Sequence, residues 1–383
     1  MKRRIVIIAT FLFLLGLLGL WGCGSPSSDY KSTEHEQSGL KYEKSMELLY
    51  AENFSVDYYE GGYKILTTIP NEREYLIVPE GKEAPENLSE AMEVIKRPIE
   101  DIYLVASAVM DMFSELDGLD TISFSGRQAD DWYIEKAKEA MENGDMIYAG
   151  KYSQPDYELI VSKGCKVAIE NTMIFHSPQV IEKLEDFNIP VMVEYSSYEN
   201  HPLGRVEWIK FFAALIGKEE QAEEIFDRQS DILNKVISDK KTGKTVGFFF
   251  ITSNGLAQIR RPSDYIPKII NLAGGKYIFD QFGDDDSKKS TMNIQIEEFY
   301  NAGKDADYLI YNSSIDGGVD SIDELIEKCQ VLSDFKAVKE KNVWCTTSDM
   351  YQQSMSVGYL TEDIHNMLEG KSEDDMHYLF PLR

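Results

Sequence analysis

Two consecutive helical segments in the middle of the chain limit its possible folds more than any other feature. Leu203–Ile216 carries an apolar stripe that ends at Gly217, and Glu219–Ser238 repeats apolar residues at helical spacing. Twenty residues at about 1.5 Å each make a rod about 30 Å long. Short apolar runs alternate with amphipathic segments on both sides of this pair, which is typical of α/β domains. The sequence therefore predicts two α/β lobes joined by a long rigid α-helix that allows only small relative motion.

The two alternating blocks set the expected domain bounds. We expect an N-terminal lobe over residues 51–202, joining helices over 203–240 and a C-terminal lobe over 241–383. Strands of the first lobe are predicted at 63–69, 75–78, 102–106, 121–124, 167–169 and 191–194, with helices at 131–141, 155–163 and 178–187. In the second lobe, strands are predicted at 245–252, 308–311 and 342–345, and helices at 265–273, 296–302, 321–328 and 357–368.

The first 23 residues resemble a lipoprotein export signal. Three basic residues at positions 2–4 precede an apolar run over 5–20, and Leu-Trp-Gly-Cys at positions 20–23 resembles a lipobox. Sixteen apolar residues are short for the roughly 20 that cross a membrane. We therefore predict a cleaved signal peptide at 1–22, lipid on Cys23 and a flexible polar tether over 23–50. This places the mature protein outside the cytoplasm, attached to the cell membrane.

Charge and cysteine usage exclude several classes of function. The chain has 39 Lys and Arg against 66 Asp and Glu, a net charge of −27, which becomes −30 once the signal is removed. Such a surface repels phosphate backbones, so we expect no nucleic-acid partner. Cys165, Cys329 and Cys345 show no metal-binding spacing. Cys165 and Cys345 lie in apolar runs that predict small buried side chains, and a Cys329–Cys345 disulfide is left open.

Motifs of catalysis and cofactor binding are absent or incomplete. Gly243-Lys244-Thr245 lacks the earlier glycine of a phosphate loop and precedes a strand instead of following one. The acidic run at 284–286 lacks the spacing of a calcium loop. We therefore expect a protein that is not an enzyme and carries neither a cofactor nor a bound metal.

Four segments carry a resemblance to a known family. They are 154–169 (QPDYELIVSKGCKVAI), 201–208 (HPLGRVEW), 265–275 (YIPKIINLAGG) and 337–344 (AVKEKNVW). In this order they resemble the helical-backbone class of substrate-binding proteins of ABC importers, which serve ferric siderophores, haem and cobalamin. The resemblance implies the class III periplasmic-binding-protein fold, with two Rossmann-like lobes. It also implies a monomer that passes its ligand to an ABC permease and its ATPase.

The resemblance leaves alternatives within and outside the family. An iron chelate, with a ferric siderophore as the first candidate, is the expected ligand, and a corrinoid or haem receptor is the alternative. A non-transport surface protein with the same fold is a further alternative. A nitrogenase-like metallocluster enzyme would need cluster-ligating cysteines that the chain lacks. The acidic residues with which such receptors dock on the permease have no clear counterpart here, because Lys276 follows the Gly274-Gly275 pair.

Ligand-binding residues are expected in the loops that follow the strands. In α/β lobes ligands bind outside the carboxyl ends of the strands, so both lobes would face one shared cleft. Tyrosine, arginine and asparagine in these loops suit a large amphipathic ligand with anionic or carbonyl groups. The predicted ligand-binding residues are Arg127, Lys151, Tyr152, Asn171, Tyr195, Tyr198, Arg260, Arg261, Tyr311 and Tyr351. His201, just before the first joining helix, is predicted to cap that helix, with metal or haem ligation as the alternative.

Overall fold

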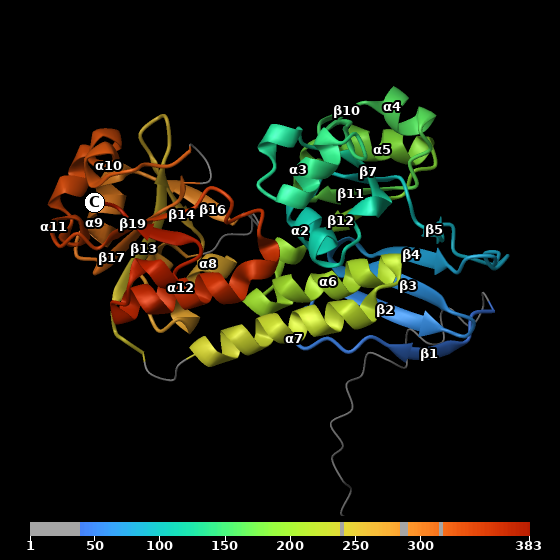
Figure 1. The fold of residues 1–383 in the computed structure, drawn as a ribbon, viewed down its shortest axis with the longest axis horizontal. Coiled ribbons are helices and arrows are strands. Elements are labelled where there is room, and N and C mark those ends of the chain that lie inside the picture. The colour runs from blue at the N-terminus through green and yellow to red at the C-terminus, as the bar shows by residue number, and fades with distance from the viewer. Residues whose placement is uncertain (1–38, 238–240, 284–289, 314–316) are drawn as a thin grey trace, which may run out of the picture.

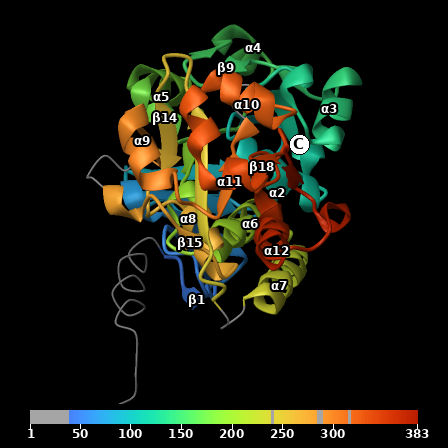
Figure 2. The ribbon, with the colours of Figure 1, turned by 90° about the vertical axis from the view of Figure 1, so that its left-hand side faces the viewer.

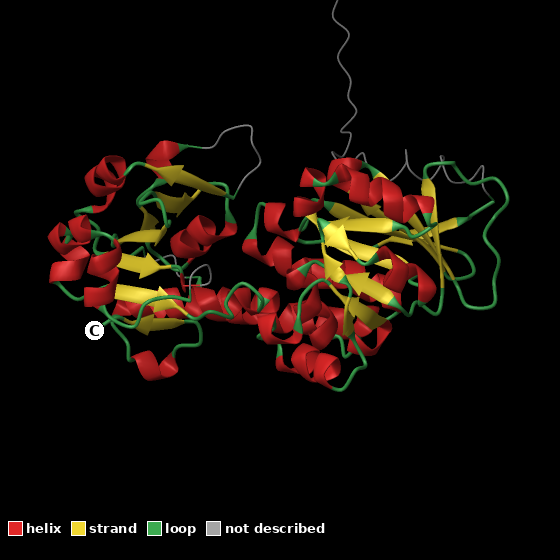
Figure 3. Ribbon diagram, turned by 90° about the horizontal axis from the view of Figure 1, so that it is seen from above, coloured by secondary structure: helices red, strands yellow, loops and turns green. Residues whose placement is uncertain are grey.

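The structure is a computed structural model that describes residues 39–237, 241–283, 290–313 and 317–383 (Figure 1). The predicted signal peptide, Cys23, the first part of the tether and the acidic run at 284–286 lie outside these residues. The described chain forms two α/β lobes with helices around a sheet in each, as Figure 3 shows from above.

The N-terminal lobe is built on a parallel five-stranded sheet of order β12-β11-β6-β7-β8. All carboxyl ends of these strands therefore lie at one edge. The strands are β6 (Ile102–Leu104), β7 (Ile122–Ser125), β8 (Ile147–Tyr148), β11 (Val167–Asn171) and β12 (Val191–Glu194), and the helices are α2 (Ser107–Glu115), α3 (Glu135–Glu142), α4 (Tyr157–Ser162) and α5 (Pro178–Asp186). A short ribbon of β9 (Gly150–Lys151) and β10 (Gln154–Pro155) follows β8.

The C-terminal lobe has a mixed sheet of order β16-β14-β13-β17-β18-β19, in which β15 also pairs with β13. Its parallel core is β13 (Thr245–Ile251), β17 (Tyr308–Tyr311), β18 (Val343–Thr346) and β15 (Lys276–Tyr277), and its antiparallel strands are β14 (Ala257–Arg260), β16 (Thr291–Ile294) and β19 (Leu379–Pro381). The helices are α8 (Tyr265–Leu272), α9 (Ile296–Gly303), α10 (Ile322–Lys328), α11 (Lys336–Lys339) and α12 (Val357–Glu369).

A second sheet precedes the N-terminal lobe, in the order β1-β2-β3-β4-β5. It consists of β1 (Tyr42–Ser45), β2 (Phe54–Tyr59), β3 (Tyr63–Thr68), β4 (Arg73–Val78) and β5 (Met92–Lys96). The sequence predicted only the β3–β4 hairpin, and the tether predicted to reach residue 50 was too long, because β1 already pairs with β2. One face of this sheet packs on the first joining helix, where the Phe54 ring lies 4.9 Å from Trp208 and 5.3 Å from Phe211.

The junction between the lobes consists of three helices rather than one. The joining helices are α6 (Pro202–Ile216) and α7 (Glu219–Val236), and α12 of the C-terminal lobe packs along α7 (Figures 1 and 2). Every residue of α6 from Pro202 to Leu215 is buried, which suits a helix that is apolar on most sides. No helix of the described residues is long and apolar enough to span a membrane.

Two buried carboxylates bind the start of the N-terminal sheet to the junction. Glu207 of α6 accepts the backbone N–H groups of Leu49, Tyr50 and Ala51 at 2.8–3.1 Å. Glu199, just before α6, accepts those of Glu52 and Asn53 at 2.8 and 3.1 Å. Charged acceptors make strong hydrogen bonds with backbone donors. The segment ahead of β2 is thus fixed to the central helix.

The three described cysteines are buried and form no disulfide, so the Cys329–Cys345 bridge is not present. The prediction that Cys165 and Cys345 are small buried side chains is confirmed. Lys244 of the discarded phosphate-loop motif also has a structural role, because its ammonium donates to the carbonyl of Leu368 at 2.5 Å.

Candidate functional site

The carboxyl edge of the N-terminal sheet carries a row of exposed large apolar side chains. We call Tyr133, Tyr148, Met173, Phe175 and Tyr198 the N-lobe rim; between 39% and 48% of each is exposed. They follow or end β7, β8, β11 and β12, so they lie along the same edge. Exposed apolar side chains gathered in this way mark an interaction site more often than isolated ones do.

Tyr195 supports this row from below. Its ring is buried and lies 6.3 Å from the rings of both Phe175 and Tyr198. Burial raises the pKa of Tyr195 to about 12, so its phenol is neutral at physiological pH. Of the two predicted tyrosines, Tyr198 is exposed and Tyr195 packs beneath the row.

The two lobes meet where their strands end. The loop after β18 reaches the N-terminal lobe, and Gln352 accepts the N–H of Tyr133 at 2.9 Å and donates to the carbonyl of Asp131 at 2.8 Å. Ser354 donates to the carbonyl of Ala108 in α2 at 2.5 Å. We call this contact the lobe seam. It shows that the carboxyl ends of both sheets face each other.

A buried acid completes the lobe seam. Asp111 of α2 accepts the N–H of Met355 at 2.8 Å, and its carboxyl group is almost wholly buried. Burial raises the pKa of Asp111 to about 7. The protonation state of this contact therefore changes near neutral pH.

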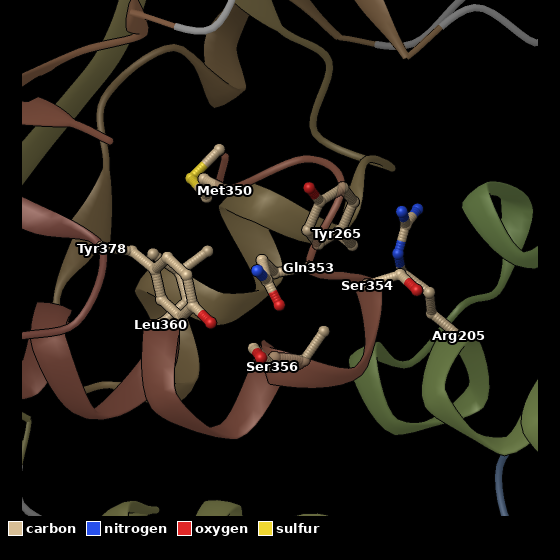
Figure 4. A pocket seen from close by; sticks show the side chains of 9 residues that line it. Arg205, Tyr265, Met350, Gln353, Ser354, Ser356, Leu360 and Tyr378 are labelled. Atoms are coloured by element: carbon tan, nitrogen blue, oxygen red, sulfur yellow. The ribbon is translucent and has the colours of Figure 1, made fainter. Parts of the chain in front are cut away.

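Two arginines, Arg205 and Arg260, each lie over a tyrosine ring beside the seam, and Figure 4 shows the first of these pairs, Arg205 with Tyr265. The guanidinium of Arg205, in α6, lies 4.7 Å from the centre of the Tyr265 ring. That of Arg260 lies 4.8 Å from the Tyr351 ring and 3.4 Å from a carboxylate oxygen of Asp264. Arg205, Tyr265 and Met350 also line a cavity of about 10 Å³, the size of a single water molecule. The group offers positive charge and aromatic faces to an anionic or unsaturated ligand.

The predicted residues of the N-terminal lobe are dispersed. Arg127 is exposed after β7, with its guanidinium 5.8 Å from the Trp132 ring. Lys151 is exposed in β9 and Tyr152 is half-buried beside the core. Asn171 ends β11 and accepts the N–H of Met173 at 2.9 Å, which positions a rim residue.

The predicted residues of the C-terminal lobe fall into three environments. Arg260 and Tyr351 are brought together, as described above. Arg261 donates to the carbonyl of Thr291 at 3.3 Å on the neighbouring strand. Tyr311 is wholly buried against Phe249 and Phe250, which removes it from the candidate site.

The strand-end argument was wrong for Arg260 and Arg261, because β14 runs antiparallel to β13. Arg260 follows Ile259, which pairs with Phe249, so the end of β14 lies beside the middle of β13 and not at its carboxyl end. Arg260 still reaches the seam through its long side chain, which packs over Tyr351.

The sequence argument missed Arg205. It looked for ligand residues in loops, whereas Arg205 lies in the first turns of a joining helix. The available signal was the presence of charged residues, Arg205 with Glu207 and Lys210, in a helix with an apolar stripe. His201, four residues earlier, caps α6 by accepting the N–H of Leu203 at 3.1 Å, which confirms its predicted capping role.

Glu170 is a buried acid beneath the N-lobe rim. Its side chain is wholly buried at the end of β11, and neither carboxyl oxygen has a hydrogen-bond partner. Burial raises the pKa of Glu170 to about 8. No group of three or more His, Cys, Asp or Glu side chains within the described ranges is arranged to hold a metal ion.

No family model matches the chain. Among curated proteins it is 28% identical over 336 residues to the "uncharacterized lipoprotein MJ0878" of Methanocaldococcus jannaschii, covering 82% of this chain and 77% of that protein. It is 26% identical over 351 residues to the "uncharacterized lipoprotein MJ0872" of the same organism, covering 87% and 86%.

Solved structures resemble the chain over 70–71% of its length and 97–98% of theirs. They include a possible iron-binding periplasmic protein of Staphylococcus epidermidis (14% identity, TM-score 0.54). The haem-binding HutB and the vitamin B12-binding BtuF of Vibrio cholerae match at 15% and 14% identity, with TM-scores of 0.55 and 0.51. The fold is that of the class III periplasmic binding proteins.

The second lipoprotein matches a larger share of the chain than these solved structures do. Residues 99–383 make up about three quarters of the chain, which is room enough for the whole match to the solved structures. The second lipoprotein matches 87% of the chain, which is more than residues 99–383 and the undescribed residues 1–38 make up together. That relative therefore matches at least some of residues 39–98, the part of the chain that contains the N-terminal sheet.

Proposed function

We propose that the chain is the solute receptor of an ABC importer, anchored by lipid on Cys23, and that it captures an iron chelate, with a ferric siderophore as the first candidate. The N-lobe rim beside the arginines of the lobe seam carries this proposal. Aromatic side chains bury the faces of a large ligand, and arginine pairs with its oxygens. The fold supports the proposal further, because proteins named as binders of iron, haem and vitamin B12 have the same fold.

Titration of the mature protein with a ferric siderophore, haem and cyanocobalamin tests the ligand class. Trp132 and the rim tyrosines lie close enough to report binding through intrinsic fluorescence. We expect saturable quenching by the ferric siderophore. Saturation by cyanocobalamin alone would refute the iron-chelate proposal.

The exposed apolar row favours haem or a corrinoid as the second candidate, because both present broad flat faces. Haem binding would show as a shifted Soret absorption band that Tyr198→Phe alters if the phenol ligates iron. His201 is poorly placed for that role, since its Nδ1 already accepts the Leu203 N–H and its ring stacks on Tyr50 at 4.4 Å.

The anchor has a separate test. Cys23→Ser should move the protein from the membrane fraction to the soluble fraction and leave ligand affinity unchanged. Equal membrane retention of the variant and the wild type would contradict lipid attachment at Cys23.

A further inference from the structure

Arg205 is a buried cation with no ion-pair partner among the residues that the structure describes. Only 5% of the residue is exposed, and its guanidinium makes one hydrogen bond, to the hydroxyl of Ser197 at 3.0 Å. No carboxylate in the described ranges lies within 4.0 Å of its nitrogens. Arginine cannot shed its proton in a protein, so it cannot become neutral on burial. A buried charge of this kind is costly unless an anion faces it.

The nearest acids do not meet that need. Asp264, at the start of α8, already pairs with Arg260 at 3.4 Å and accepts the N–H of Ile266 at 3.0 Å. Asp111, across the seam, accepts the N–H of Met355 and is partly protonated at neutral pH. Arg205 and Arg260 both lower the pKa of Asp264, so this one carboxylate is shared between two guanidinium groups.

The surroundings of Arg205 connect it to the rim. Its hydrogen-bond partner Ser197 precedes Tyr198, whose ring is part of the N-lobe rim. The guanidinium points away from α6 toward Tyr265, and the hydroxyls of Ser356 and Tyr378 lie around the cavity beyond (Figure 4). A ligand lying on the rim would thus bring an attached group next to the guanidinium.

We infer that Arg205 is the anion-binding residue of the ligand site, and that the solute carries an anionic oxygen group, such as a carboxylate, which pairs with its guanidinium while an apolar or aromatic part lies on the N-lobe rim. This inference rests on the proposed function and narrows it to anionic, amphipathic solutes. In this arrangement the N-lobe rim provides the apolar contact area for the ligand, and Arg205 provides the preference for an anionic group. A guanidinium presents two parallel N–H groups that match the two oxygens of such an anion.

Two fluorescent dyes that differ in charge test this inference. 8-Anilinonaphthalene-1-sulfonate carries an anionic oxygen group, and N-phenyl-1-naphthylamine is its neutral counterpart. For Arg205→Gln we expect the dissociation constant of the sulfonate dye to rise about tenfold or more, since a charged hydrogen bond is lost. The neutral dye should bind both proteins within twofold. Phe175→Ala should weaken both dyes, which places them on the rim.

The controls separate the possible failures. Arg228→Gln removes an exposed arginine of α7 and should change neither affinity. Equal binding of the sulfonate dye by wild type and Arg205→Gln, with Phe175→Ala still weakening both dyes, would overturn the role of Arg205 and leave the rim intact. Failure of wild type to bind either dye would count against the ligand surface itself, and against both proposals. Matching circular dichroism spectra establish that the variants are folded.

Discussion

Replacing Glu170 by glutamine should change how the stability of the protein depends on pH. In the fold, Glu170 holds its proton to about pH 8, whereas an unperturbed glutamate releases it near 4.5. Between these values the folded state binds more protons than the unfolded chain, so the free energy of unfolding falls as pH rises. Burial without any hydrogen-bond partner is the cause.

The magnitude follows from the two pKa values. Each pKa unit corresponds to about 1.4 kcal/mol, so ionisation of Glu170 costs about 1 kcal/mol of stability at pH 5, about 3 at pH 7 and about 5 at pH 9. Glu170→Gln removes this dependence. The buried amide adds a penalty of about 1–3 kcal/mol that is the same at every pH. The informative quantity is therefore the change with pH of the difference between variant and wild type.

Urea unfolding at pH 5, 7 and 9, followed by tryptophan fluorescence, measures this difference. We expect the variant to gain about 4 kcal/mol relative to wild type between pH 5 and pH 9. Glu158→Gln, on the exposed face of α4, is the matched control and should leave the pH dependence of stability as it is in wild type. A constant difference between Glu170→Gln and wild type across this range would refute the argument from burial.

Three further predictions follow from single contacts. Burial raises the pKa of Asp111 to about 7, so the wild type should lose up to about 4 kcal/mol of stability as pH rises from about 4 to 7, and Asp111→Asn should not show this loss. If the melting temperatures of wild type and variant changed with pH in the same way, this prediction would be wrong. Gly217→Ala should lower the free energy of unfolding by about 2 kcal/mol, because Gly217 has φ +82° and the added Cβ would displace the Arg97 guanidinium. Gly164→Ala is the control: Gly164 has φ +79° but open space around it, so the loss measured in the same urea titration should be smaller. Glu207→Gln should speed hydrogen exchange at residues 49–51, where the carboxylate accepts three backbone N–H groups, and unchanged protection would show that these bonds do not hold the segment.

Much of the fold followed from local pattern. Strands β12 and β17 begin and end where the sequence predicted them, because each is an apolar run between polar segments. The joining helices were also located to within two residues at each end, with Gly217 as the stop between them. Patterns of this kind depend on a few neighbouring residues.

Strand direction and long-range partners were not accessible in the same way. Nothing within β14 indicates that it runs antiparallel to β13, and that direction decides where Arg260 and Arg261 lie. β1 and β2 were missed because their pairing depends on a sheet assembled from residues 42–96. Arg205 became a candidate only when its burial and its lack of an ion-pair partner among the described residues could be seen.

The position of β1 affects how the protein would be oriented at a membrane if it is the receptor proposed above. β1 lies at one end of the molecule, beside α7, and the tips that carry α4 and α10 lie at the other (Figure 1). If lipid is attached at Cys23, sixteen residues separate it from Gly39, a contour of at most about 56 Å. A body of this size is roughly 50 Å across.

Contact between those tips and a permease would therefore use almost the whole contour of this segment. Deleting about half of residues 24–38 should abolish import and leave solute affinity unchanged. The length of the segment ahead of β1 would then limit how far the protein can move from the membrane and also which of its ends can face the membrane.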